Sequence, residues 1–377
     1  MVTNLIVKTD TLSGGSLYSP SIKQLNQFGG AGINPNPNPT LGFIIGFTGR
    51  QNRSGKTEFY MLTVDLDDPN FNCGAIKTSF LGHGITFNPT NPHVAALFEK
   101  RGTGACELDL VTGQVLREIP CTEGRQFYGH GAYSPDGKVL YSAETIVSGD
   151  FSGKIAMRDA VTLEEVGEFP SYGQRPHDCQ ILKDGKTMII TNGGGRVGEN
   201  ELGSVTYVDL KSQKLLEKLP IENKRFNAGH VAVSDNGDIV VVSAPREGSP
   251  AKKIGGVTIG GINKKLSSGK GPSNILNKMV GETLSVCVDD SRGIAAATTP
   301  DAGRITFWDI NTKVMVHTIK VTHPRGVTMT LDKKNYIFCY DKPASKLGMI
   351  NAQTLEPVQG YDVDIAMTGS HLTNYSY

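Results

Sequence analysis

The chain has 377 residues, a formal net charge of +1, 45 glycines and a single tryptophan, Trp308. This balanced charge argues against nucleic acid or an anionic membrane as the main partner, because both are bound through an excess of Lys and Arg. No stretch of the sequence has the length and apolar character of a membrane span, so none is predicted.

The first 39 residues are predicted to be an extended lead-in. Residues 34–39 alternate Asn and Pro, and every second residue there lacks a backbone N–H. Such a run fits neither a helix nor an inner strand, so we expect an extended surface segment. Residues 40–377 are predicted to form one domain.

The domain is built from a recurring unit that is clearest at residues 127–141. A small, apolar strand is followed by Ser-Pro-Asp-Gly, which is turn chemistry, and then by a second strand of alternating apolar residues. Weaker copies open on His83, His177 and His230. With His130 of the clearest copy, the openings lie 47, 47 and 53 residues apart, the period of a four-stranded propeller blade.

Counting the units predicts an all-β fold, a seven-bladed β-propeller. Residues 369–377 resemble the first strand of a unit that has no second strand after it. We expect this strand to be the innermost strand of the blade whose outer strands lie in residues 41–78, which closes the ring and removes a free sheet edge. Residues 245–277 are rich in Gly, Lys and Ser and are predicted to be a basic insertion in the fifth blade, with residues 257–259 as its one strand.

Histidines at the unit openings are the main chemical feature. Inner strands of a propeller face a central channel, so residues at equivalent positions converge there. The predicted metal ligands are His83, His130, His177, His230 and His371. Several imidazoles at one point suit copper, iron or zinc, and copper or iron are the candidate cofactors. The alternative is that each imidazole bonds to backbone at a blade junction.

The number of residues between a histidine and the next turn is different for His177 than for His130 and His230. The turn dipeptide follows His130 and His230 by six residues but follows His177 by seven. A shift of one residue turns a strand side chain to the opposite face unless a bulge absorbs it. The spacing therefore predicts that His177 faces away from His130 and His230.

Other polar residues lie near predicted strand ends. The candidate residues for binding a cofactor or small ligand are Arg125, Tyr128, Arg175, Asp178, Asn192 and Arg325. The three arginines could line an anion-binding rim at one channel mouth, or they could be ordinary loop charges. The lysines of the basic insertion are either a solvated loop or a docking surface for an acidic protein partner: Lys252, Lys253, Lys264, Lys265 and Lys270. The six cysteines lack zinc-site spacing and read as small buried side chains.

These motifs resemble a bacterial seven-bladed propeller family of unknown function. The resemblance rests on residues 127–137, Gly-Glu-Phe-Pro-Ser at 167–171, Pro-His-Asp at 176–178, Thr-Asn-Gly-Gly at 191–194, and residues 82–84, 229–233 and 303–309. It covers residues 41–377. More distantly, the chain is similar to propellers with the Tyr-Val-Thr-Asn repeat and to WD repeats. The resemblance implies twin-arginine export to the periplasm and genes for iron uptake nearby, with no established activity.

Three functions stay open at this point. The first is a binding or scaffold propeller whose histidine-lined channel mouth holds a small ligand or metal, in iron or copper handling. The second is a copper- or iron-dependent oxidoreductase, and the third is a protein interaction platform. The resemblance places the protein in the periplasm. Residues 1–7 lack the charged and long apolar regions of a signal peptide, so a native start at Met1 would place it in the cytoplasm.

Overall fold

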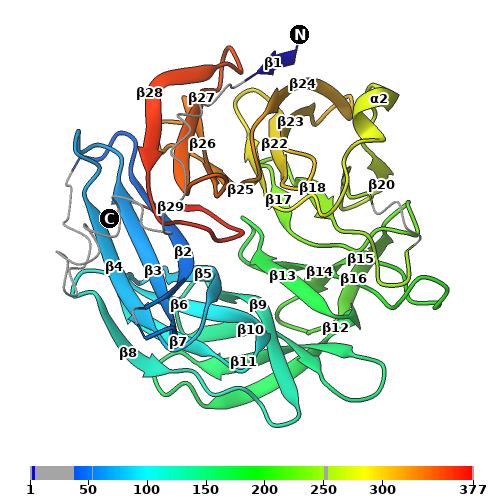
Figure 1. The fold of residues 1–377 in the computed structure, drawn as a ribbon. Helices are drawn as coiled ribbons and strands as arrows, with labels where there is room; N and C mark the ends of the chain where they lie inside the picture. The colour runs from blue at the N-terminus through cyan, green and yellow to red at the C-terminus, as the bar shows by residue number, and fades with distance from the viewer. Residues whose placement is uncertain (1, 5–37, 53, 250–253, 376–377) are drawn as a thin grey trace.

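The computed structural model describes residues 2–4, 38–52, 54–249 and 254–375 (Figure 1). In these ranges the regular structure is β-strand apart from one short helix, α2 (Ser273–Leu276). No described helix is long and apolar enough to cross a membrane. Most of the predicted lead-in lies outside the described residues, as do Lys252 and Lys253, although Val2–Asn4 form the strand β1.

Strands that follow one another in the chain pair in antiparallel sheets. One sheet contains β2 (Phe43–Gln51), β3 (Thr57–Asp65), β4 (Cys73–Thr78) and β29 (Thr373–Tyr375). An eight-stranded sheet contains β5 (Gly82–Asn88), β6 (Asn91–Gly102), β7 (Ala105–Asp109), β8 (Gln114–Glu118), β9 (Arg125–Tyr133), β10 (Val139–Ile146), β11 (Ser152–Asp159) and β12 (Glu165–Gln174). Two four-stranded sheets follow: β13 (Pro176–Ile181), β14 (Thr187–Asn192), β15 (Ser204–Asp209) and β16 (Leu215–Pro220), then β17 (Val231–Val233), β18 (Asp238–Ser243), β19 (Gly256–Gly261) and β20 (Lys264–Ser268).

Two further sheets complete the domain. The first contains β21 (Val286–Asp289), β22 (Ile294–Thr299), β23 (Arg304–Asp309) and β24 (Val314–Lys320), with β1 as a fifth strand parallel to β24. The second contains β25 (Pro324–Met329), β26 (Asn335–Tyr340), β27 (Lys346–Asn351) and β28 (Pro357–Asp364). The sheets stand around a common centre (Figure 1), so the predicted all-β propeller fold is confirmed.

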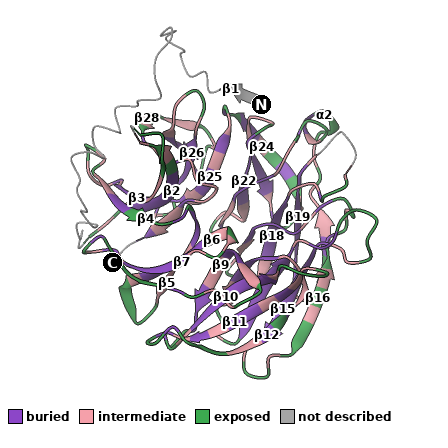
Figure 2. Ribbon diagram, turned by 60° about the horizontal axis from the view of Figure 1, so that its bottom comes forward, coloured by how far each residue is buried: buried purple, intermediate pink, exposed green. Residues whose placement is uncertain are grey.

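The apolar core lies between neighbouring sheets. The buried side chains form clusters that each join strands of two successive units; one links Phe43 and Ile45 of β2 to Leu97 of β6. Inner and middle strands are mostly buried, whereas β16 is largely exposed at the rim (Figure 2). Burying the faces between sheets stabilises the domain and leaves the inner strands to line its centre.

The strands divide into six sheets in place of the seven separate sheets that the sequence predicts. The reason is local. Strand β6 continues beyond its partner β5, and Lys100 and Gly102 pair with Tyr128 and Phe127 of β9. This short ladder joins the units β5–β8 and β9–β12 into one eight-stranded sheet.

The range 245–277 is more regular than predicted. It supplies β19, which pairs with β18, and β20, which pairs with β19, so the two form the outer half of a four-stranded sheet. Its glycines obscured the strand pattern in the sequence. Gly256 of strand β19 is one of them, and a larger residue does not fit there because a Cβ would lie 2.3 Å from the ring of Phe226.

A repeated turn follows the third strand of most units. Asp109, Asp159, Asp209, Asp309 and Asn351 each end such a strand, and the side-chain Oδ1 of each accepts a backbone N–H two or three residues later. This is an Asx turn, which holds the chain in the tight connection to the outer strand. The hydrogen bonds lower the pKa of the Asp159 and Asp209 carboxyls.

The two ends of the domain meet in one sheet. As predicted, the C-terminal strand pairs with the N-terminal one: Phe43, Ile44 and Ile45 of β2 lie opposite Tyr375, Asn374 and Thr373 of β29. The Asn374 amide also donates to the Leu41 carbonyl at 2.9 Å and to the Met329 carbonyl at 2.8 Å. Asn374 thus ties the last sheet to the first.

We expect Asn374→Ala to lower the free energy of unfolding by about 1–3 kcal/mol, because two partly buried carbonyls lose their donor. Urea denaturation followed by circular dichroism measures the change. Thr354→Ala, in an exposed turn, is the control and should stay within about 0.5 kcal/mol of the unchanged protein. Equal stability of the two variants would show that this amide does not hold the ends together.

Candidate functional site

Five histidines meet at the centre of the ring. His83 lies on β5, His130 on β9 and His177 on β13, while His230 and His371 lie just before β17 and β29. The five rings make ten pairs, and nine of these pairs have centroids 3.9–5.3 Å apart. All five predicted imidazoles are therefore brought together, although His83 and His371 are 288 residues apart in the sequence.

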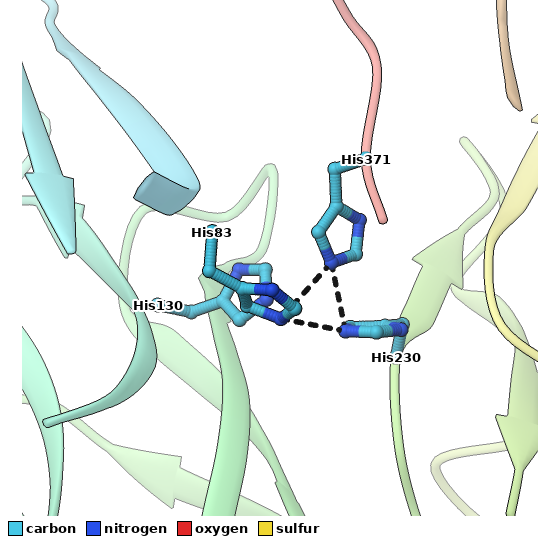
Figure 3. Close-up of side chains that lie close together, drawn as sticks. All are labelled: His83, His130, His230 and His371. Atoms are coloured by element: carbon cyan, nitrogen blue, oxygen red, sulfur yellow. Dashed lines mark hydrogen bonds between the residues drawn. The ribbon is translucent and has the colours of Figure 1, made fainter. Parts of the chain in front are cut away.

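Three of the imidazoles point their Nε2 atoms at one another (Figure 3). The Nε2 atoms of His83 and His230 lie 3.2 Å apart, those of His83 and His371 lie 3.2 Å apart, and those of His230 and His371 lie 2.8 Å apart. We call these three nitrogens the Nε2 triangle. His177 adds a fourth, with its Nε2 atom 2.5 Å from that of His230.

Hydrogen bonds to backbone fix the tautomers of two of these rings. The Nδ1 of His177 lies 2.9 Å from the Tyr128 carbonyl, and the Nδ1 of His230 lies 2.5 Å from the Leu284 carbonyl. A carbonyl only accepts, so each Nδ1 carries the hydrogen and each neutral ring has a bare lone pair at Nε2. Two lone pairs therefore face each other across 2.5 Å.

Lone pairs that face each other at this distance repel unless a cation binds one of them. His83, His130, His230 and His371 each offer one nitrogen, and these four atoms all lie within 4.8 Å of one another, an arrangement that could hold a metal ion. Two neighbouring nitrogen ligands at 2.0–2.1 Å from one ion are separated by about 2.9–3.4 Å, close to the edges of the Nε2 triangle.

The prediction that His177 faces away from His130 and His230 is wrong. The ladder between β13 and β14 slips between Pro176 and Cys179, and this irregularity absorbs the extra residue seen in the spacing. The His177 and His230 ring centroids consequently lie only 4.3 Å apart.

Glycines flank the histidines because the inner strands crowd together there. Gly129 has φ +115°, and a Cβ on it would lie 2.4 Å from the His83 ring. A Cβ on Gly84 would lie 2.4 Å from the Gly129 carbonyl and 2.6 Å from Nδ1 of His130. The Gly-His-Gly pattern therefore reports close packing around the imidazoles.

Burial lowers the pKa of every histidine in the cluster. For His83, His177, His230 and His371 desolvation brings the pKa well below its usual value, and the positive charge of Lys100 acts in the same direction. The pKa of His130 is also lowered by burial, and the Asp178 carboxylate partly opposes the shift. The cluster is therefore neutral near pH 7, which leaves lone pairs available as ligands.

Asp178 is one predicted residue that does reach the cluster. It is 5% exposed, and its Oδ1 lies 3.7 Å from Nδ1 of His130. Its Oδ2 accepts the backbone N–H of Val231 at 3.1 Å and the Gln180 amide at 3.3 Å. Asp178, His130, His230 and His371 all line a cavity of about 580 Å³ beside the cluster.

Tyr128 also lies beside the cluster, because its carbonyl holds His177. Its hydroxyl accepts a hydrogen bond from Arg101 at 3.2 Å, and the Arg101 guanidinium lies over its ring. Arg325 donates to the Thr368 carbonyl at 3.1 Å, in the segment that leads to His371, and its charge lowers the pKa of His371.

The remaining predicted residues have structural partners elsewhere. Arg175 donates to the Gly194 carbonyl at 2.7 Å and stacks on Phe151. Asn192 is fully buried in a network with Ser171 and Thr206. Arg125 pairs with Glu168 and Glu144, next to the buried Arg158. Arg125, Arg175 and Arg325 therefore each have partners within the chain.

Sequence reasoning missed Lys100 and Thr191. The positive charge of Lys100 contributes to the lowered pKa of all five histidines, and burial lowers the pKa of Lys100 itself. Thr191 accepts the Asp178 backbone N–H at 2.9 Å and donates to the Gly229 carbonyl at 2.5 Å, so it links Asp178 to the residue before His230. A lysine at the end of the apolar run 94–98 was the one available signal for Lys100.

The six cysteines are free thiols. Burial raises the pKa of Cys73 to about 11 and of Cys106, Cys287 and Cys339 to about 12. Thiols held protonated in this way are poor metal ligands. Cys106, Cys179 and Cys339 are buried as predicted, whereas Cys73, Cys121 and Cys287 are half-buried.

Comparisons with known proteins place the chain by family and fold. A family model described as "Protein of unknown function (DUF1513)" matches residues 77–369. No curated protein matches the sequence. Among solved structures, hydrazine synthase of Kuenenia stuttgartiensis is similar at 16% identity with a TM-score of 0.63, over 85% of this chain and 99% of that one. At this identity the likeness extends to the fold alone.

In the presence of a chelator, we expect the protein to lose stability as the pH falls below about 6.5. The unfolded chain binds protons at its histidines near that pH, while the buried cluster resists protonation, so acid favours unfolding. Each such histidine contributes up to about 1.4 kcal/mol per pH unit. Urea unfolding at pH 5.0, 6.0 and 7.0 measures this slope. The slope should be smaller in His230→Gln, and equal stability at all three pH values would contradict the expectation.

We expect Glu144→Gln to lower the free energy of unfolding by about 3–5 kcal/mol, because it leaves the buried Arg158 without its charge partner. Glu164→Gln, on an exposed turn, is the control. Urea denaturation measures both variants. A change below about 1 kcal/mol for Glu144→Gln would show that the pair is not a structural unit.

Proposed function

Because this chain belongs to the family described as "Protein of unknown function (DUF1513)", whose description gives no activity, we propose a function from the site itself: the protein binds one transition-metal ion at the centre of the ring. The ligands are the imidazoles of His83, His230 and His371, whose Nε2 atoms form the Nε2 triangle, and the rings of His177 and His130 lie beside them. The observation that carries this proposal is the Nε2 triangle, whose edges of 2.8–3.2 Å fit three ligands of one ion.

The electrostatics of the cluster support a cation more than a structural role. A set of neutral imidazoles bonded only to backbone has no reason to aim lone pairs at one point. Here the Nδ1 atoms of His177 and His230 are bonded to backbone carbonyls, while their Nε2 atoms approach to 2.5 Å. A metal ion bound by the His230 Nε2 atom takes up that lone pair, which removes the repulsion and offsets the cost of burying the rings.

The ligand type narrows the choice of metal. Imidazole nitrogen suits copper, zinc, iron and nickel, and no thiol joins the described group of ligands. Affinity among divalent ions of this row is highest for copper. We therefore propose copper first and iron second, in a binding protein for one of these metals.

The ring proposed to carry this site spans residues 40–377 and has seven blades. The eight-stranded sheet divides at its two-pair ladder into two units of four strands, β5–β8 and β9–β12, which together with the other sheets make seven units. An apolar cluster lies between these two units, as it does between other neighbouring units. The pairing of β29 with β2 supports closure of the ring by the C-terminal strand.

A metal-dependent oxidoreductase is the second candidate. The observation that favours it is the cavity of about 580 Å³, which reaches His130, His230 and His371 and would let a substrate approach the ion. Turnover of a redox dye by the metal-loaded protein, absent after removal of the metal, would favour this candidate over a binding protein.

An interaction platform receives less support. Lys264 pairs with Asp238 at 2.6 Å and Lys265 with Glu222 at 3.1 Å, so these charges have partners within the chain. A partner captured through residues 254–277 by protein that contains no metal would favour the platform.

We expect protein purified without chelator, and then loaded with copper(II), to hold one ion per chain. The double substitution His83→Ala and His230→Ala removes two corners of the Nε2 triangle. Loss of a residue that only hydrogen-bonds to a metal ligand weakens metal binding roughly 10–100-fold, and loss of two ligands should weaken copper binding by more than that. Elemental analysis and copper titration measure stoichiometry and affinity.

His93 is an exposed histidine on β6, so His93→Ala is the matched control and should bind copper as the unchanged protein does. Circular dichroism shows whether the double variant is folded. A folded double variant that binds copper with undiminished affinity would overturn the proposed site.

A further inference from the structure

We propose that the cavity beside the cluster binds a small organic molecule through an anionic oxygen donor, which takes an open position on the metal and contacts His130 and Asp178. This proposal rests on the proposed metal site and adds the class of molecule that reaches it.

The cavity opens onto only part of the cluster. His130, His230 and His371 line it, whereas His83 and His177 do not. An ion held by the Nε2 triangle therefore has protein ligands on one side and the cavity on the other. A position left open toward a cavity is the arrangement of metal sites that accept an exogenous ligand.

His130 differs from the other four histidines. Its Nε2 atom is buried and has no hydrogen-bond partner, whereas Nε2 of the others lies within 3.2 Å of another imidazole nitrogen. Figure 3 shows its ring behind that of His83 and outside the dashed triangle. A buried nitrogen without a partner is costly, and a molecule bound at the metal can supply the missing hydrogen bond.

Asp178 holds His130 in place for this contact. Its Oδ2 atom is fixed by the backbone N–H of Val231 and by Gln180, which leaves Oδ1 directed at Nδ1 of His130, 3.7 Å away. A carboxylate beside one imidazole nitrogen orients the ring, so the other nitrogen, Nε2, is available to hydrogen-bond with a bound molecule. His130 is therefore a ligand-contacting residue, and Asp178 is its positioning residue.

Charge and polarity indicate the chemical class of the ligand. Around a divalent ion the imidazoles are neutral. Among the described residues that line the cavity, Asp178 is the one acidic side chain and Lys183 is a cation, so the site keeps a positive charge that an anionic donor would balance. The walls include the apolar side chains of Ile85, Phe87, Val286 and Leu372, which suit an organic body. A volume of about 580 Å³ lies within the usual range for small-molecule sites.

The test uses copper(II)-loaded full-length protein with azide and benzoate as probes. Copper is counted first by elemental analysis. Azide binding is followed by its charge-transfer absorption on copper, and benzoate by its competition with azide. We expect His130→Phe and Asp178→Asn to retain one copper per chain and to raise the Kd for azide at least tenfold. Glu123→Gln, an exposed carboxylate of the same charge, should leave it unchanged.

A third variant separates the cavity from the metal. Thr86 lines the cavity and is partly exposed, so Thr86→Phe fills space there and leaves the histidines themselves unchanged. It should raise the Kd for benzoate at least tenfold and leave that for azide within twofold.

Each outcome separates this inference from the metal proposal. Protein that holds no copper overturns both. Copper that binds with azide affinity unchanged in His130→Phe and Asp178→Asn overturns the role of these residues alone, and loss of copper in His130→Phe makes His130 a metal ligand instead. Azide binding that benzoate does not compete with overturns the organic ligand.

Discussion

The structure at the centre of this protein depends on lone pairs that face one another. His177 and His230 donate from Nδ1 to backbone carbonyls, so their Nε2 atoms are bare when the rings are neutral, and these atoms lie 2.5 Å apart. Burial keeps both rings neutral by lowering the pKa of each. Without a cation this contact is repulsive, and a cation bound at one of the two Nε2 atoms would remove the repulsion. The same backbone bonds that hold the rings therefore also define what the centre can bind.

The rest of the polar network sets how strongly positive that centre becomes. Lys100 disfavours protonation of all five imidazoles, and Asp178 acts against it at His130. A lysine near a metal site weakens the attraction for a cation but strengthens it for an anion bound to that cation. The electrostatics are thus better suited to an ion that carries an anionic ligand than to a bare ion.

Pairing between the two ends of the domain and assembly of the histidine cluster are coupled. His371 is supplied by the segment just before β29, and β29 is held by pairing with β2. The Nε2 triangle therefore needs residues from near both ends of the domain, and it forms only when the last strand has joined the first. An ion at the triangle would in turn stabilise that closure, because anything that binds only the folded state adds to its stability.

Several features of the site could be predicted because they are local. Period-2 alternation and Ser-Pro-Asp-Gly turns identified strands, the 47-residue spacing identified four-stranded units, and the histidine at each opening identified the residues that converge. The orphan strand at the C-terminus was matched correctly to β2 because an unpaired inner strand needs a partner.

The sequence by itself determined the all-β architecture, the strand order within units and the identity of the five imidazoles, since periodicity and turn chemistry act over a few residues. Only the tertiary structure decided that His177 joins the cluster through a bulge, that β6 and β9 merge two units, and that Lys100 lies near the centre. These outcomes depend on packing between strands of different units, and a bulge or an extended ladder leaves no periodic trace in the chain. Which nitrogen of each ring faces the centre was likewise set by carbonyls on neighbouring units, so only the assembled ring could specify it.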